Sequence, residues 1–273
     1  MKKIIRLGIM GLAALLVVLS CISCKAKTET TFEPEGTSKG ELTLGFDAEY
    51  PPYGYLDTET NQYVGFDIDF AKAVCNKLGY TLNLRPIVWE TKDSALETGE
   101  IDFIWNGFTM NGREDDYEWT CPYVDNTIVV LTKADSGITT LADLAGKTVT
   151  VQADSSGENA LKNEENAALV ASFNGGKYLT CKDYTTAYQD LTAGAVDAIV
   201  IDIGVANYFA GEEDVILEES IFEEQYGVGF YKGNTALRDE IQGAMIELAT
   251  TTDLISQLCE TYGIDEEAVV LGK

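Results

Sequence analysis

The chain has 273 residues, which predicts about two domains at roughly 150 residues each. Hydrophobic residues make up 45% and charged residues 23%, which argues against a disordered chain and against a multi-span membrane protein. The net charge of −26 makes nucleic acid a poor partner, because such a surface repels phosphates. The absence of histidine excludes His-ligated metal sites and histidine-activated nucleophiles.

The first residues have the layout of a secretory signal. Lys2, Lys3 and Arg6 precede an uncharged, mostly apolar stretch over residues 7–24. An uncleaved membrane helix is the alternative, because this stretch is close to the lower end of the roughly 17 to 25 residues that span a bilayer. We expect cleavage, because the basic start and the small residues at the end are typical of an export signal.

The end of this stretch, Val18-Leu19-Ser20-Cys21, resembles the bacterial lipobox. We therefore expect a lipoprotein signal peptide over residues 1–20 and lipidation of Cys21, with Cys24 as the alternative. Residues 25–40 are polar and have no periodicity, so we expect a lipid-anchored flexible linker over residues 21–40. The expected location is the outer face of the cell membrane.

Strands and helices alternate along the first half of the body. The pattern predicts strand 42–46, a Pro-rich loop 47–53, helix 66–78, strand 81–87, helix 92–98 and strand 101–105. Gly79 follows the helix 66–78 as a C-cap, and we interpret Asp67 and Asp69 as capping carboxylates rather than as a DxD metal motif. Such alternation implies βαβ units and a parallel sheet.

The pattern restarts in the second half. It predicts strand 127–132, a short helix 140–144, strands 148–151, 198–201 and 226–231, and helices 235–249 and 253–262. Residues 96–104 (LETGEIDFI) and 191–199 (LTAGAVDAI) match at the Leu, Gly, Asp and final Ile positions. This internal echo predicts two similar α/β halves, and we interpret its glycines and aspartates as structural.

Loops follow the strands of both halves. Residues 47–53 and 107–113 follow strands of the first half, and residues 154–157 and Asp202 follow strands of the second. Because ligands of open α/β sheets bind outside the carboxyl ends of the strands, these loops predict a cleft between two lobes.

These segments together resemble the extracellular solute-binding proteins of the polar amino acid family, the receptors of ABC importers, over residues 41–263. The resemblance is carried by these fragments: Asp47-x-x-Tyr50-Pro-Pro-Tyr53, Val64-Gly-Phe-Asp-Ile-Asp69, Trp105-Asn-Gly-Phe-Thr109 with Arg113, Leu141-x-Asp-Leu-x-Gly-Lys147, Val151-Gln152 with Ser155-Ser156, Ala195-x-Asp-Ala198 with Asp202, and Tyr226-Gly-Val-Gly229. It implies a periplasmic-binding-protein-like type II fold, with two α/β lobes joined by a two-strand hinge. Lobe 1 would comprise residues 41–128 and 228–273, and lobe 2 residues 129–227.

The resemblance also assigns one end of a site for an amino acid zwitterion. Arg113 matches the arginine whose planar fork binds the ligand's α-carboxylate. The backbone of Gly107 and Thr109, the Thr109 hydroxyl, and Ser155 or Ser156 at a helix start complete that anion site.

At the other end, Asp202 matches the carboxylate that takes the α-ammonium. Tyr50 and Trp89 match two aromatics that sandwich the ligand's carbon chain. We also expect Asp47, and less so Glu49, to face the ligand's side chain, which favours a cationic or amide-bearing ligand.

The expected function is therefore a receptor that captures a polar L-amino acid and delivers it to an ABC transporter permease, without covalent chemistry, metal or cofactor. A ligand sensor for a signalling partner and a dehydratase on the same fold are the alternatives. Arginine, lysine, glutamine, histidine and cystine all suit the expected slot. The sequence leaves open whether the four cysteines of the body, Cys75, Cys121, Cys181 and Cys259, are free or paired.

Overall fold

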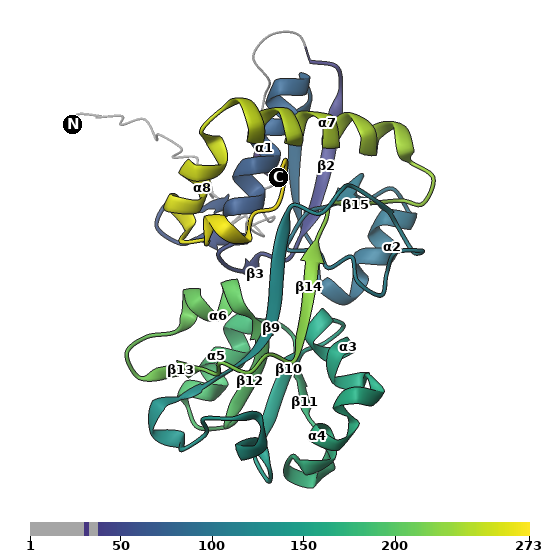
Figure 1. Ribbon diagram of the computed structural model, residues 1–273. Helices are drawn as coiled ribbons and strands as arrows, with labels where there is room; N and C mark the ends of the chain where they lie inside the picture. The colour runs from purple at the N-terminus through teal and green to yellow at the C-terminus, as the bar shows by residue number, and fades with distance from the viewer. Residues whose placement is uncertain (1–29, 33–37) are drawn as a thin grey trace, which may run out of the picture.

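The computed structural model describes residues 30–32 and 38–273, which fold into two lobes that lie one above the other in Figure 1. The predicted signal peptide and Cys21 lie outside the described residues. Among the residues described, none of the helices has the length and apolar character needed to cross a membrane. The predicted fold class, two α/β lobes connected by two strands, is confirmed.

The first lobe contains a six-stranded sheet in the order β1-β6-β2-β7-β15-β8. Its strands are β1 (Thr30–Phe32), β2 (Glu41–Phe46), β6 (Thr81–Pro86), β7 (Phe103–Ile104), β8 (Glu118–Trp119) and β15 (Gly229–Phe230). Strand β2 pairs in parallel with β6 and β7, as the βαβ pattern predicted. Strand β1 pairs antiparallel with β6, so the prediction of a flexible linker is wrong at its three residues.

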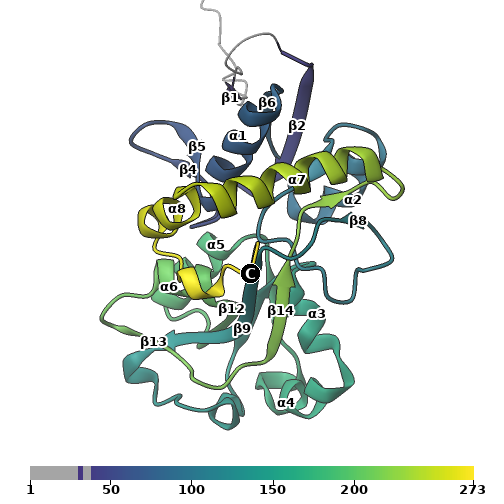
Figure 2. The same cartoon turned by 45° about the horizontal axis from the view of Figure 1, so that its top comes forward.

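Helices cover this sheet. They are α1 (Phe66–Leu78), α2 (Lys92–Glu97) after the 3₁₀ turn η1 (Trp89–Thr91), α7 (Thr235–Thr251), α8 (Leu254–Tyr262) and the 3₁₀ turn η6 (Glu266–Ala268). The C-terminal helices α7 and α8 lie against α1, so the chain returns to the first lobe at its end (Figure 2).

Helix α1 has the predicted bounds, but its first acidic residue does not cap it. The apolar side of the helix is buried, and Gly79 ends it at φ +83°, where a glycine is favoured. Asp67 is fully buried and accepts hydrogen bonds from the Gly107 N–H at 2.6 Å and from the Tyr123 hydroxyl at 2.8 Å. The capping interpretation of Asp67 is wrong, and its carboxylate instead holds the loop that follows β7.

The second lobe is built around the sheet β11-β10-β12-β9-β13, with β14 also paired to β9. Its strands are β9 (Val124–Lys133), β10 (Val149–Gln152), β11 (Leu179–Cys181), β12 (Ala198–Asp202), β13 (Asp214–Ile216) and β14 (Phe222–Tyr226). Its helices are α3 (Ser156–Lys162), α4 (Ala167–Ser172), α5 (Tyr184–Thr192) and α6 (Ile203–Phe209), with 3₁₀ turns η2 (Ala134–Ser136), η3 (Leu141–Leu144), η4 (Glu164–Asn166) and η5 (Asn174–Gly176).

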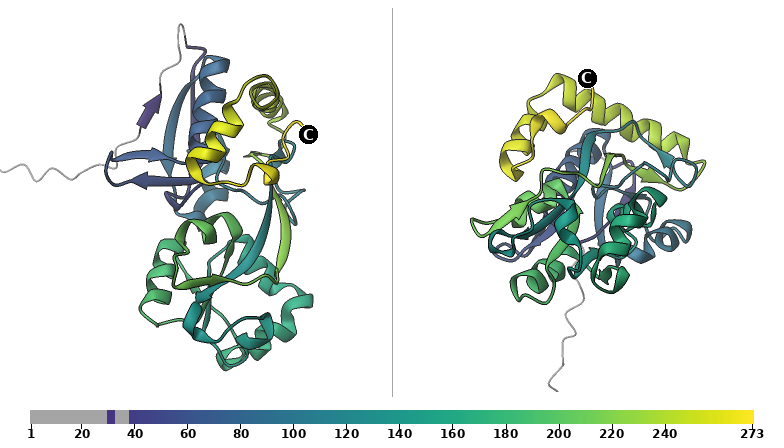
Figure 3. Two further views of the ribbon diagram at one scale, coloured as in Figure 1. Left: turned by 60° about the vertical axis from the view of Figure 1, so that its left-hand side comes forward. Right: turned by 60° about the horizontal axis from the view of Figure 1, so that its bottom comes forward.

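Strands β9 and β14 run side by side between the lobes (Figure 3, left). They pair antiparallel from Phe222 opposite Ile128 to Tyr226 opposite Val124. The predicted single strand over residues 226–231 is wrong, because the extended run ends at Tyr226 and a short break precedes β15. The predicted lobe boundaries after residues 128 and 227 stay a prediction.

A small sheet, β3-β4-β5, stands beside α1, and its first strand lies within the predicted loop 47–53. Its strands are β3 (Glu49–Tyr50), β4 (Gly54–Asp57) and β5 (Gln62–Val64), and they pair antiparallel in sequence order. Hydrogen bonds from Tyr53 N to Tyr50 O at 3.1 Å and from Phe66 N to Pro52 O at 2.9 Å fix the intervening turn. This sheet therefore places Tyr50 at the carboxyl end of β2.

The sequence echo corresponds to the same hydrogen bonds in both lobes. In the first lobe, Thr43 N donates to Asp102 Oδ2 at 2.7 Å, and Asp102 N donates to Thr43 O at 2.8 Å. In the second lobe, Thr148 N donates to Asp197 Oδ2 at 2.7 Å, and Asp197 N donates to Thr148 O at 2.8 Å. The structural interpretation of both aspartates is confirmed.

The four cysteines of the body are free in the structure. Cys75 and Cys259 are buried, and burial raises the pKa of both thiols. The largest cluster of buried hydrophobic residues contains residues of both lobes, and a second one lies within the second lobe. A third cluster, rich in aromatic residues, surrounds Phe108 beside α2.

Candidate functional site

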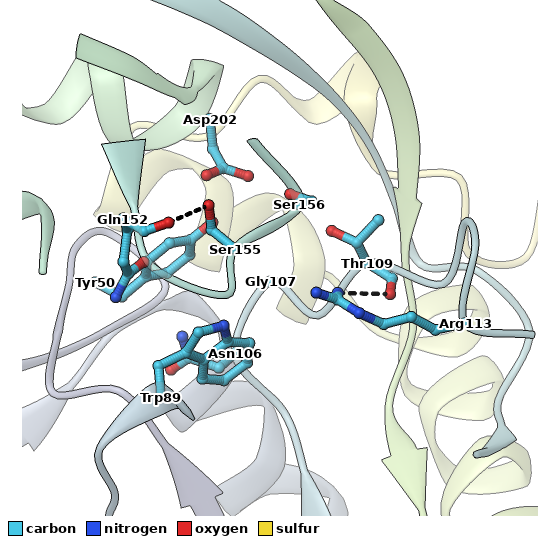
Figure 4. A pocket seen from close by; sticks show the side chains of 10 residues that line it. All are labelled: Tyr50, Trp89, Asn106, Gly107, Thr109, Arg113, Gln152, Ser155, Ser156 and Asp202. Atoms are coloured by element: carbon cyan, nitrogen blue, oxygen red, sulfur yellow. Dashed lines mark hydrogen bonds between the residues drawn. The ribbon is translucent and has the colours of Figure 1, made fainter. Parts of the chain in front are cut away.

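A small cavity lies between the lobes at the carboxyl ends of β7, β10 and β12 (Figure 4). Its volume of about 20 Å³ is room for about one water molecule, so an amino acid would fit only after the surrounding side chains or the lobes move apart. Eight of the nine residues predicted as ligand contacts line it: Tyr50, Trp89, Gly107, Thr109, Arg113, Ser155, Ser156 and Asp202. The ninth, Asp47, lies in an adjoining pocket.

Arg113 forms one side of the cavity and is 9% exposed. Its guanidinium donates to the carbonyl oxygen of Thr109 at 3.3 Å and to that of Asp154, in the second lobe, at 3.3 Å. It also lies 5.3 Å from the centre of the Phe108 ring. Both of its hydrogen-bond acceptors are neutral carbonyl groups, so its positive charge is available to an anion in the cavity.

Asp202 enters the cavity from a different side, as Figure 4 shows. It is the last residue of β12 and is 2% exposed. Its Oδ1 accepts from the Tyr226 hydroxyl at 2.6 Å and from Asn126 Nδ2 at 2.8 Å. Burial raises the pKa of this carboxyl above its ordinary value, so a cationic group in the cavity would stabilise its charged form.

Several predicted anion donors have protein partners in this closed arrangement. The N–H of Gly107 donates to Asp67, and the hydroxyls of Thr109 and Ser156 both donate to Glu224, at 2.9 and 3.1 Å. Ser155 is the N-cap of α3 and accepts from Glu158 N at 3.1 Å. These hydroxyls must reorient before they can donate to a bound carboxylate.

The two predicted clamp aromatics are nearly buried, with Tyr50 6% and Trp89 8% exposed. The Tyr50 ring lies 5.9 Å from the ring of Tyr184, in the second lobe. The Trp89 ring meets Phe108 edge to face at 5.4 Å, and the Lys92 ammonium lies 5.2 Å from its centre. Neighbours thus hold both rings in place at the cavity wall.

Asp47 lies in a neighbouring pocket that shares Trp89 with the cavity. Its carboxylate accepts from Gln152 Nε2 at 2.7 Å and from Glu49 N at 2.9 Å. Burial, with smaller contributions from the charges of Asp183 and Glu49, raises the pKa of Asp47 to about 6. Nowhere in the described part of the chain do three or more potential metal ligands cluster.

Direct contacts join the lobes at the cleft. Lys92 of α2, 2% exposed, forms an ion pair with Asp154, which precedes α3. Gln152, at the end of β10, bonds Asp47 across the same gap. The structure is therefore a closed form with the two lobes in contact.

The sequence interpretation did not select Asn106 and Gln152, which also line the cavity. Asn106 Oδ1 accepts from Asp47 N at 3.1 Å and is 2% exposed. Both residues come directly at the end of an apolar strand, so the carboxyl-end rule that selected Asp202 was sufficient to find them.

Comparisons with known proteins agree with this geometry. Residues 42–263 match the bacterial extracellular solute-binding proteins, family 3. The L-cystine-binding protein TcyJ of Escherichia coli K12 is 26% identical over 271 residues, covering 95% of this chain and 98% of TcyJ. The arginine-binding extracellular protein ArtP of Bacillus subtilis is 28% identical over 247 residues, covering 88% and 93%.

A solved structure is also similar. The substrate-binding protein of an ABC uptake transporter from Streptococcus pneumoniae, with bound histidine, superposes with a TM-score of 0.79 at 30% identity, covering 84% of this chain and 94% of that one. Both the sequence profile and the fold therefore agree with a role in amino acid uptake. The chain belongs to the bacterial extracellular solute-binding proteins of family 3.

Proposed function

We propose that this protein captures a polar L-amino acid in the cleft between its lobes and delivers it to an ABC import permease. The observation that carries the proposal is a pair of buried groups of opposite charge, Arg113 and Asp202, that line one cavity from different lobes. A zwitterion has a carboxylate for the first group and an ammonium for the second.

Binding is proposed to proceed through closure. Arg113, Tyr50 and Trp89 come from the first lobe, whereas Ser156 and Asp202 come from the second. A ligand that contacts both sets binds the closed form better than the open one, so it shifts the population toward closure. The permease would recognise that closed form.

The side chain is proposed to be cationic. Asp47, Glu49 and Asp183 line the pocket that adjoins the cavity at Trp89, and Lys182 is the one basic side chain there. Burial makes the charged form of Asp47 unfavourable while it has no cationic partner. A guanidinium or ammonium group of the ligand would stabilise that charged form, and burial keeps water from screening the attraction. Arginine, and cystine through its second ammonium group, fit this pocket better than glutamine.

Binding without catalysis is also part of the proposal. The relatives and the solved structure named above are binding proteins. A dehydratase on this fold would use cleft carboxylates as acid and base. Incubation with prephenate-like acids tests that alternative, and release of a dehydrated product would support it.

Membrane attachment through lipid on Cys21 completes the proposal. The lipobox-like run before Cys21 supports it. Fractionation of Cys21→Ala and Cys24→Ala variants tests it, since only loss of the lipidated cysteine moves the protein from the membrane to the soluble fraction.

A thermal-shift screen of the chain from Lys25 onward, against the twenty L-amino acids with cystine and ornithine, tests the binding function. A ligand that binds only the folded state raises the midpoint as RT ln(1 + [L]/Kd). We expect a shift for the cationic amino acids or cystine. Folded, ligand-free protein that responds to none of these compounds would overturn the proposal.

A further inference from the structure

Two buried carboxylates lie beside each other where the hinge meets the second lobe. Asp202 ends β12 and is 2% exposed, and Glu224 lies in the middle of β14 and is 3% exposed. Asn126, on β9, donates from its single Nδ2 atom to Asp202 Oδ1 at 2.8 Å and to Glu224 Oε1 at 2.8 Å. One amide group therefore bridges the two acids.

Glu224 contacts the candidate site from the hinge side. Its Oε1 also accepts from the hydroxyls of Thr109 and Ser156, which line the cavity from opposite lobes. Its Oε2 is buried and has no hydrogen-bond partner in the described part of the chain. The side chain thus holds two hydroxyl groups of the cavity wall with one oxygen and leaves the other without a partner, which indicates a missing partner because burial of such an atom is unfavourable.

The surroundings of the two acids are neutral. The groups that donate to them are the amide of Asn126 and hydroxyl groups. The other titratable groups that face the pair are four tyrosines, and burial raises the pKa of each well above its ordinary value: Tyr50, Tyr53, Tyr184 and Tyr226. These tyrosines stay uncharged near neutral pH. Arg113 lines the same cavity, but its guanidinium donates to the carbonyl oxygens of Thr109 and Asp154, and no ion pair with either carboxylate is found among the described residues.

The pair therefore holds a proton when no cation is present. Burial raises the pKa of both carboxyl groups, and burial together with the charge of Asp202 raises the pKa of Glu224 to about 8. Two like charges in contact with one nitrogen atom cannot both ionise readily in a buried place.

We propose that Glu224 and Asp202 together form the subsite for the ligand's α-ammonium group, which displaces the proton that the pair holds in the empty cleft. The inference rests on the proposed function and adds a second carboxylate to its site. As the ammonium enters, the O–H bond of the protonated carboxyl breaks, the oxygen keeps the electron pair and the proton passes to water or a buffer base, so one positive charge replaces another. Affinity therefore rises with pH until the empty pair is ionised, by up to tenfold per pH unit.

Isothermal titration calorimetry of the full-length protein in detergent micelles tests the subsite. The probes are L-arginine, L-cystine, L-histidine and L-glutamine, titrated between pH 7.0 and 8.5 in phosphate and in Tris, whose ionisation enthalpies differ. The window starts above the pKa of about 6 of Asp47, so titration of that neighbour contributes little. We expect the binding heat to differ between the buffers by the amount due to release of up to one proton per ligand.

Two variants locate the proton. Glu224→Gln keeps an oxygen acceptor for Thr109 and Ser156 but does not ionise. Ligand binding by this variant should therefore release no proton above pH 7, and its affinity for the ligand should not change with pH in that range. Glu223→Gln, on the exposed side of the same strand, removes the same charge and should retain the wild-type release.

Binding of a probe by the wild-type protein without proton release overturns the subsite and leaves the proposed function intact. Equal release by wild-type and Glu224→Gln proteins also overturns it. Failure of folded protein to bind any probe overturns the proposed function and this subsite together. Where Glu224→Gln does not fold, Asp67→Asn takes its place, because Asp67 is the other buried carboxyl near the site with a pKa of about 7, and proton release that disappears in this variant overturns the subsite.

Discussion

Residues 96–104 and 191–199 perform the same structural task in the two lobes, yet the chain beyond each of them presents a side chain of opposite charge to the cavity. In both, a glycine with positive φ, Gly99 at +74° and Gly194 at +71°, ends a helix. In both, an aspartate exchanges two hydrogen bonds with a threonine of the adjacent strand. After β7 the chain leads to Arg113, whereas after β12 it reaches Asp202 at once.

The comparison separates scaffold from chemistry. The repeated residues position the strand ends, and the residues beyond them, which do not repeat, supply a cation on one side and an anion on the other. A duplicated scaffold thereby presents two different charges to one ligand. Each change below tests one part of that division.

The largest effect is expected at the cationic side. Arg113→Ala should weaken ligand binding by about 100- to 1,000-fold, because loss of a buried charge partner costs about 2–5 kcal/mol. Calorimetry measures the change, and Arg113→Lys is the control, since it keeps the charge without the planar fork and should lose less. An Arg113→Ala protein that binds within threefold of the wild type would remove Arg113 from the site.

The anionic side should show the next largest effect. Asp202→Asn keeps an acceptor for Tyr226 and Asn126 but removes the charge, so affinity should fall by about 10- to 100-fold, as expected for a hydrogen bond to a charged group. Unchanged affinity would show that Asp202 does not contact the ligand and only accepts hydrogen bonds from Tyr226 and Asn126 at the hinge.

The scaffold should respond in stability and not in binding. Asp102→Ala and Asp197→Ala each leave one backbone N–H unpaired, so each should lower the free energy of unfolding by about 1–3 kcal/mol. Urea unfolding measures this, with the exposed Asp135→Ala as control. Clearly unequal losses in the two lobes would mean that the echo is not a shared structural device.

A smaller effect concerns the loop that leads to Arg113. Burial raises the pKa of Asp67 to about 7, so folding favours its protonated form, and stability falls as pH rises from about 4 to 7. Asp67→Asn should remove most of this slope, because an amide does not titrate. Thermal unfolding across pH measures it, and identical slopes would show that Asp67 does not titrate there.

The smallest effect is expected at the contact between the lobes outside the ligand site. Lys92→Met removes the ion pair with Asp154, whose side chain is 45% exposed, so affinity should weaken about two- to fivefold. Added salt should weaken binding by the wild-type protein more than binding by the variant. A tenfold loss would instead indicate that Lys92 also fixes Trp89.

The features that could be predicted from the sequence are mainly those of the scaffold. Apolar periodicity gave helix α1 at its observed bounds, and the position of Asp202 directly after an apolar strand indicated a buried carboxylate. The fold class followed from alternation and from the echo. Local patterns sufficed wherever a residue's role depended on its own strand or helix.

Roles set by tertiary contacts were missed. Asp67 has the spacing of a capping residue, but the loop after β7 contributes the N–H that it accepts. Glu224 lies in an acidic run that indicates an exposed surface, although it shares a face of β14 with buried Tyr226. Its partners come from β9, from α3 and from the loop after β7, which only the folded chain brings together.

A crystal structure of the protein with the amino acid that gives the largest thermal shift tests the central claim most directly. The account predicts the α-carboxylate on the Arg113 guanidinium and the α-ammonium against Asp202, with the carbon chain between Tyr50 and Trp89. A ligand bound in the reverse orientation, or outside the cavity between the lobes, would contradict it.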